Sequence, residues 1–121
     1  MTDPIPPRLR LRVHFGSTML GPGKADLLEL IAQTGSISAA GRAMKMSYKR
    51  AWTLVDEMNT AYNAPLVSSV RGGPEGGGAH LTETGTRVLA LYRSMTGKVA
   101  DATADEVAAL NDMIARKDTD G

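Results

Sequence analysis

The sequence predicts a mainly α-helical fold with a small antiparallel β-sheet. Three observations lead to this prediction. Apolar residues recur at helical spacing in four stretches, two short strand-like segments flank a run of glycines, and proline or glycine marks most boundaries between them. Hydrophobic residues make up 42% of the 121 residues, which is enough to bury the core of one ordinary domain.

Composition excludes several classes of protein. The chain has no cysteine, which rules out disulfides and thiolate metal sites. It shows neither a signal-peptide pattern nor an apolar run long enough to span a bilayer, so we expect a soluble cytoplasmic protein without a membrane partner. Residues 1–97 hold 11 basic and 7 acidic residues, a net charge of +4, whereas residues 98–121 carry −3. A basic body of this kind suits a polyanionic partner.

The N-terminal part contains one alternating segment. Residues 1–7 are polar and proline-rich, and we expect them to be flexible. From Arg8 to Phe15, apolar residues alternate with Arg8, Arg10, Arg12 and His14, which predicts a half-buried strand. Its basic row is either the solvated face of an edge strand or a surface that faces DNA, and both interpretations stay open.

Three helices are expected next. Residues 24–34 carry Leu27, Leu28, Leu30 and Ile31 at helical spacing, and Gly35 comes directly after them, where a helix ends. A short helix within residues 36–44 can take Ser36 or Ser38 as its N-cap. Lys45 and Met46 form a break, Ser47 is another N-cap, and residues 48–59 form a third helix with Ala51, Val55 and Met58 on one face.

The second half predicts a hairpin and a long helical region. Strands at 66–70 and 79–81 flank the glycine-rich loop 71–78, and Thr82 caps the helical region after the hairpin. The apolar residues of this last region recur at steps of four and three: Val88, Tyr92, Met95, Val99 and Ala102, then Leu110 and Met113. This stripe predicts contact with a second subunit or packing on the first helix. We therefore divide the chain into a flexible N-terminus (1–7), a DNA-binding domain (8–82), a helical dimerisation region (83–115) and a flexible tail (116–121).

This order of elements is that of a winged helix-turn-helix, in which the helix after the tight turn enters the major groove of DNA. Arg42, Lys45, Lys49 and Arg50 surround the turn, and no acidic residue occurs between Gly35 and Leu54. The alternative for such a cluster is a solvated helix face. The candidate DNA-binding residues are Ser36, Ser38, Arg42, Lys45, Ser47, Tyr48, Lys49, Arg50, Thr53, Arg71, Gly72 and Gly73.

Other sites find little support in the sequence. His14 and His80 have no acidic neighbours at metal-ligand spacing, so no metal site is expected. The glycine-rich loop lacks the Gly-Lys-Ser/Thr ending of a phosphate-binding loop and precedes a strand. With no nucleophile–base pair or paired carboxylates either, an enzyme is not expected.

Several runs of residues resemble a known family. They are Leu28-Glu29-Leu30-Ile31-Ala32-Gln33-Thr34-Gly35-Ser36-Ile37-Ser38-Ala39-Ala40, Met46-Ser47-Tyr48-Lys49-Arg50-Ala51-Trp52, Val55-Asp56-Glu57-Met58-Asn59, Pro65-Leu66-Val67, Gly72-Gly73, Gly76-Gly77-Gly78-Ala79 and Leu81-Thr82. Between about residues 9 and 95 the chain is similar to the DNA-binding domain of ModE-type molybdate-responsive regulators, which is related to the LysR-type winged helix-turn-helix. The resemblance implies a homodimer on a two-fold symmetric operator, with residues 47–59 as reader, residues 71–79 as wing and a role in molybdenum or metal-oxyanion homeostasis.

The resemblance also implies that the first and last helices form the dimer interface. The candidate interface residues are Leu27, Leu30, Ile31, Val88, Tyr92, Met95 and Val99. Full-length regulators of this type continue into β-barrel domains that bind molybdate, whereas this sequence ends at Gly121, so no cofactor is expected here. The alternative function is an interaction module that pairs with a full-length regulator or a separate sensor protein and does not bind DNA tightly alone.

Overall fold

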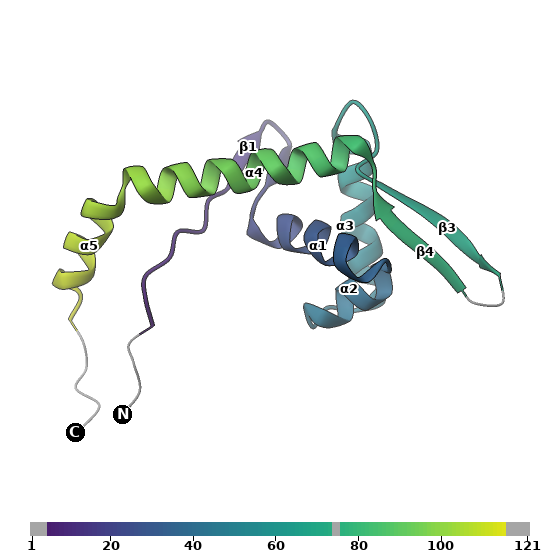
Figure 1. The fold of residues 1–121 in the computed structure, drawn as a ribbon, viewed down its shortest axis with the longest axis horizontal. Helices are drawn as coiled ribbons and strands as arrows, with labels where there is room; N and C mark the ends of the chain where they lie inside the picture. The colour runs from purple at the N-terminus through teal and green to yellow at the C-terminus, as the bar shows by residue number, and fades with distance from the viewer. Residues whose placement is uncertain (1–4, 74–75, 116–121) are drawn as a thin grey trace, which may run out of the picture.

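The computed structural model describes residues 5–73 and 76–115, with only the backbone described at 71–73, 76 and 77. Figure 1 shows the long helix α4 lying across the helices α1, α2 and α3, with a β-hairpin projecting from one end. In chain order the elements are β1 (Val13–Phe15), β2 (Thr18–Leu20), α1 (Pro22–Thr34), α2 (Ile37–Ala43), α3 (Tyr48–Ala61), β3 (Val67–Gly73), β4 (Gly76–Leu81), α4 (Glu83–Ala102) and α5 (Ala104–Met113). The predicted fold class, mainly helical with a small antiparallel β-structure, is confirmed.

The main core lies where α1, α2 and α3 meet the base of the hairpin. It is built from the apolar faces of the three helices and the first residues of β3, because these faces repeat every three to four residues and so turn towards one another. Its buried members are Leu27, Leu28, Ile31, Ile37, Ala40, Ala51, Leu54, Val55, Met58, Leu66, Val67 and Ala79.

A smaller cluster attaches α4 to the start of α1. Tyr92 of α4 packs with Leu20 and Ala25, and its hydroxyl donates a 2.6 Å hydrogen bond to the backbone oxygen of Leu11. A buried phenol requires such a polar partner, since an unpaired hydroxyl would be costly to desolvate. The last helix is thereby fixed to the N-terminal segment.

Side-chain caps set the beginnings of three helices. Ser36 caps α2 by accepting from the Ala39 amide at 3.0 Å, and Ser47 caps α3 by accepting from the Arg50 amide at 3.0 Å. Thr82 caps α4 through the Gly85 amide and donates to the Pro65 backbone oxygen at 2.6 Å. These bonds satisfy amides that have no partner inside the helix. The expected caps Ser47 and Thr82 are confirmed, and Ser36 rather than Ser38 caps α2.

The strands form two separate antiparallel pairs, β1–β2 and β3–β4. In the hairpin Val67 pairs with Leu81 and Val70 with Gly78, and the register shifts between Val70 and Gly73. The hairpin predicted around the glycine-rich loop is confirmed, with strands longer than expected.

The prediction of a strand from Arg8 to Phe15 is wrong for most of its length. Only Val13–Phe15 is a strand, because its partner β2 has three residues and the chain then turns into α1 at Pro22. The apolar side of the alternation is not buried either, since Leu9 is 42% exposed and Phe15 is 54% exposed. No second layer covers this segment among the described residues.

The last helical region is also divided. α4 ends at Ala102, and α5 begins at Ala104 after a change of direction at Thr103. Over residues 5–73 and 76–115, no helix is both long enough and apolar enough to cross a membrane. The predicted flexible ends fall largely on residues 1–4 and 116–121, which lie outside the described residues.

Candidate nucleic-acid interface

The turn between α2 and α3 brings these two helices into close contact. A Cβ at Gly41 would lie 2.9 Å from the Cβ of Ala51, so glycine is needed where α2 crosses α3. Lys45 then adopts a left-handed backbone conformation with φ 60°, and Ser47 starts α3. A left-handed residue reverses the chain in few residues, which gives the tight turn that was predicted at Lys45 and Met46.

Four cationic side chains surround this turn. Arg42, Lys45, Lys49 and Arg50 are all exposed, and none of them forms an ion pair within the part of the chain that the structure describes. The buried side of α3 consists of Ala51, Leu54, Val55 and Met58. The apolar face is therefore buried in the core, and the opposite, cationic face is left to solvent.

The exposed face also carries groups that can contact bases. Tyr48 is 63% exposed and rests edge-on against Trp52, with 6.1 Å between ring centroids. Thr53 is exposed, and its hydroxyl donates to the Lys49 backbone oxygen at 2.9 Å. The Ser47 hydroxyl accepts a bond as the α3 cap and still has its proton to donate, so it can cap the helix and contact a phosphate oxygen together.

The other predicted contact residues are less exposed or lie beyond the described side chains. Ser36 and Ser38 are half-buried at the start of α2, where Ser36 is held as the cap. The backbone of Arg71, Gly72 and Gly73 forms the end of β3, but the Arg71 side chain lies outside the described residues. The structure thus gathers Arg42, Lys45, Ser47, Tyr48, Lys49, Arg50 and Thr53 around one turn, and it places β3 and β4 beside them as a separate element.

Sequence reasoning did not identify the residue that fixes this hairpin relative to α3. The Asn59 side chain accepts from the amides of Leu66 and Val67 at 2.9 and 3.0 Å and donates to the Val67 oxygen at 3.1 Å. Three bonds from one amide group hold the end of α3 against the start of β3. The only signal in the sequence was the position of Asn59 within the run of family resemblance, because helical periodicity does not reveal a backbone partner.

The predicted dimer-interface residues fall into two groups. Leu27 and Ile31 are fully buried and Tyr92 is nearly so, all within the single chain, so their side chains pack in the protomer's own core. Leu30, Val88 and Val99 are partly buried, and Met95 is 37% exposed. Leu91 on the same helix is 54% exposed and was not predicted. Packing on the first helix, the intramolecular alternative, thus accounts for the first half of the α4 stripe.

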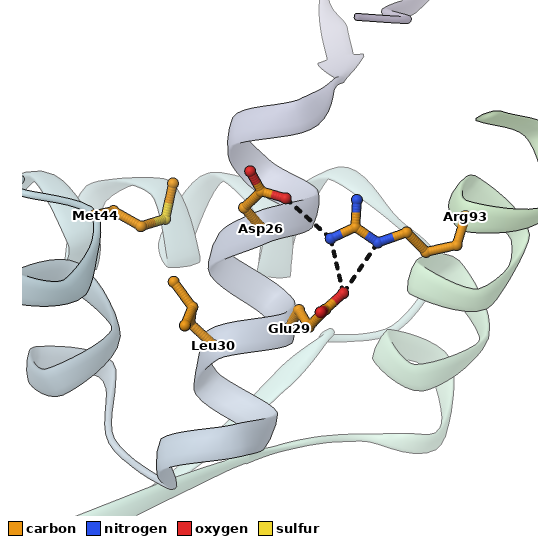
Figure 2. A pocket seen from close by; sticks show the side chains of 5 residues that line it. All are labelled: Asp26, Glu29, Leu30, Met44 and Arg93. Carbon is orange, nitrogen blue, oxygen red and sulfur yellow. Dashed lines mark hydrogen bonds and ion pairs between the residues drawn. The ribbon is translucent and has the colours of Figure 1, made fainter. Parts of the chain in front are cut away.

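An ion-pair cluster links α4 to α1 (Figure 2). The Arg93 guanidinium donates to Glu29 Oε1 from Nε at 3.0 Å and from Nη2 at 2.7 Å, and Nη2 also lies 2.9 Å from Asp26 Oδ1. Burial lowers the pKa of Arg93, but the hydrogen bonds to Asp26 and Glu29 outweigh this and raise it overall. With Leu30 and Met44 these residues line a shallow hollow. Since Arg93 occupies both carboxylates, we interpret the cluster as a tie between helices.

The described residues offer no alternative metal chemistry. Within residues 5–73 and 76–115, no group of three or more histidine, aspartate or glutamate side chains could hold a metal ion. His14 and His80 are exposed and lie on separate hairpins.

Comparison with known proteins identifies the family of this domain. Residues 24–86, which span α1 to the beginning of α4, match the bacterial regulatory helix-turn-helix proteins of the lysR family. The chain belongs to this family. The matched segment contains the cationic turn, α3 and the hairpin, which are the elements that the fold gathers at the candidate interface.

Relatives with known names share more of the chain. It is 44% identical over 88 residues to the molybdenum transport protein ModE of Azotobacter vinelandii, covering 73% of this chain and 32% of that protein. It is 41% identical over 92 residues to the molybdenum-pterin-binding protein MopB of Rhodobacter capsulatus, covering 76% and 34%. It is 39% identical over 98 residues to the DNA-binding transcriptional dual regulator ModE of Escherichia coli K12, covering 78% and 37%. The chain therefore spans about a third of the length of these relatives.

One solved structure has a similar fold. It is FabT of Streptococcus pneumoniae in complex with DNA, with a TM-score of 0.54, 13% identity, and coverage of 77% of this chain and 69% of that one. At this identity the likeness concerns the fold alone, and it agrees with the winged helix-turn-helix order.

Proposed function

We propose that this chain is the DNA-binding part of a transcriptional regulator, binds double-stranded DNA in a sequence-specific manner, and acts in molybdenum or metal-oxyanion homeostasis. The observation that carries the proposal is the exposed cationic face of α3 and its preceding turn, formed by Arg42, Lys45, Lys49 and Arg50. An α-helix fits the major groove of B-DNA, where its side chains reach base edges while flanking cations bind phosphates.

The backbone at Lys45 supports this proposal. A left-handed conformation costs a residue with a Cβ about 1 kcal/mol, and glycine would adopt it freely. A lysine at this position gives up stability while it presents a cation beside the first turn of α3. Backbone strain of this kind clusters at binding sites.

The partner that completes the site is a second copy of this chain. In the proposed homodimer, α4 contributes the exposed side chains of Leu91 and Met95 together with the partly buried Val99. Two readers related by a two-fold axis would bind a palindromic operator, with half-sites about one helical turn apart.

The molybdenum role is supported by the names of the relatives at 37–44% identity. Under this proposal the chain itself carries no cofactor and catalyses no reaction, and molybdate is sensed elsewhere. A protein of this function acts in the cytoplasm, where it has access to DNA.

Fluorescence anisotropy tests the proposal. The purified chain is titrated onto a labelled duplex from its own upstream region and onto a scrambled duplex of equal length, across a salt series. We expect much tighter binding to the upstream duplex, with affinity that falls steeply as salt rises because bound cations release counterions. Equal, weak binding to both duplexes would refute sequence-specific recognition.

A second candidate function is favoured by the exposed apolar side chains of α5, namely Leu110 and Met113. In this case the chain pairs with a full-length regulator or a separate sensor protein and binds DNA tightly only in the complex. Size-exclusion chromatography with light scattering distinguishes the two, because a homodimer has twice the chain mass alone, whereas the module stays monomeric until its partner is added.

A further inference from the structure

The N-terminal arm, defined here as residues 5–12, is a second cationic surface distinct from the reader helix. The arm has no regular secondary structure, and Arg8, Arg10 and Arg12 are all exposed. None of the three makes a hydrogen bond or ion pair within the described part of the chain. Every basic residue of the arm is an arginine, and none of its residues is acidic.

One contact fixes the base of the arm to the body. The Tyr92 hydroxyl donates to the Leu11 backbone oxygen at 2.6 Å, whereas residues 5–10 make no hydrogen bond to any other described residue. Leu9 and Ile5 are exposed as well, so apolar packing does not hold the arm down. The chain therefore leaves α4 at a defined point and extends freely beyond it.

The arm also runs to the side of the molecule where DNA is expected. In Figure 1 it leaves the body beside α4 and passes downwards, on the side of α4 on which α2 and α3 also lie. From Leu11 to Ile5 an extended chain reaches about 20 Å at about 3.3 Å per residue. This reach exceeds the roughly 6 Å width of the minor groove.

We propose that the N-terminal arm is a second DNA-binding element, which lies along the minor groove beside the half-site and binds backbone phosphates and groove walls through Arg8, Arg10 and Arg12. This inference rests on the proposed function, since it needs the chain to bind a duplex. In an extended arm alternate residues face the same side, which turns the three guanidinium groups towards the groove together. Arginine suits a narrow minor groove because of its strong negative potential.

The competing partner for the arm is the acidic surface of α5 in a second copy, formed by Asp105, Glu106 and Asp112. DNA is favoured because the arm and α5 lie near the same end of the molecule, yet no ion pair forms between them within the described residues. The absence of lysine from the arm also fits planar arginine contacts in a groove better than general attraction to acidic side chains.

The test uses the double variant Arg8→Gln/Arg10→Gln. Arg12 is retained because a Cβ at the neighbouring Gly21 would lie only 3.0 Å from its Cγ, so its stem lies against the body. Lys98→Gln removes an exposed cation from α4 and serves as the control. Anisotropy titrations on upstream and scrambled duplexes give the slope of log affinity against log salt, and sedimentation gives the dimer dissociation constant.

We expect the double variant to bind both duplexes more weakly by the same factor, because phosphates and groove walls carry little sequence information. Each lost phosphate contact reduces the salt slope by about 0.9, so two contacts per chain reduce it by about 1.8. The slope of Lys98→Gln should equal that of the unaltered chain. An unchanged slope with an altered dimer constant would assign the arm to α5 and overturn the proposal, as would no change in either. Failure of the unaltered chain to bind upstream DNA would instead refute the proposed function and this inference together.

Discussion

The link between the reader helix and the hairpin rests on one side chain, and replacing it should destabilise the domain measurably. Asn59→Ala removes three hydrogen bonds, two accepted from the amides of Leu66 and Val67 and one donated to the Val67 oxygen. At about 1 kcal/mol net for each bond, the free energy of unfolding should fall by about 3 kcal/mol. Asn59→Asp keeps both accepted bonds and should lose about 1 kcal/mol.

Urea denaturation measures this loss. The chain has a single tryptophan, Trp52, which packs against the main core on α3 and so reports the unfolding of this region by fluorescence. All variants are compared at one protein concentration, because a dimer's apparent stability depends on concentration. Asn63→Ala is the matched control: the same substitution four residues later, at an exposed asparagine, should change stability by less than about 0.5 kcal/mol.

Equal urea midpoints for Asn59→Ala and Asn63→Ala would refute this prediction, since the three bonds would then contribute nothing. Equal damage from Asn59→Asp and Asn59→Ala would refute it as well, because the two accepted bonds would then not be the main contribution.

Three further predictions concern α4. Gly85→Ala should destabilise the domain by about 1–3 kcal/mol, because a Cβ there would clash with the Leu66 backbone, whereas Gly97→Ala on the same helix meets open space and should be neutral or stabilising by up to about 1 kcal/mol; urea midpoints of the pair decide this. Burial raises the pKa of Tyr92, so the folded chain retains its phenol proton above pH 10 and stability should fall as pH rises further; a Tyr92→Phe chain, compared by urea midpoints from pH 9 to 11, should show a smaller fall. Arg93→Ala should cost about 1 kcal/mol, less in high salt because the cluster is partly exposed, and a salt-independent loss in thermal melts would contradict an ionic origin.

The sequence predicted the elements whose signals are local. Helical spacing with the caps Ser47 and Thr82 located α3 and the start of α4, because a cap and an apolar period are both encoded within a few residues. The cationic turn was predicted for the same reason, since charge and exposure are set by the face opposite Ala51 and Val55. The role of Asn59 was missed, because its partners are backbone atoms across a turn and leave no pattern in the sequence.

Non-local packing explains the errors. The alternation from Arg8 to Phe15 describes a strand only if a neighbour of equal length exists, and β2 is too short to provide one. Tyr92 lies on the same stripe as Met95, yet the former packs on Leu20 and Ala25 and the latter is exposed. Periodicity identifies an apolar stripe without saying what covers each part of it, so the division between core and dimer surface could not be predicted.

The central claim is that the exposed face of α3 reads DNA. It is tested most directly by anisotropy titrations of Lys49→Ala, Arg50→Ala and Lys98→Ala on the upstream and scrambled duplexes. If α3 is the reader, Lys49→Ala and Arg50→Ala should each weaken binding to the upstream duplex by about 1–3 kcal/mol and narrow its advantage over the scrambled one. Lys98→Ala should bind both duplexes like the unaltered chain. If the two α3 variants bind the upstream duplex as tightly as Lys98→Ala does, α3 is not the element that reads the operator.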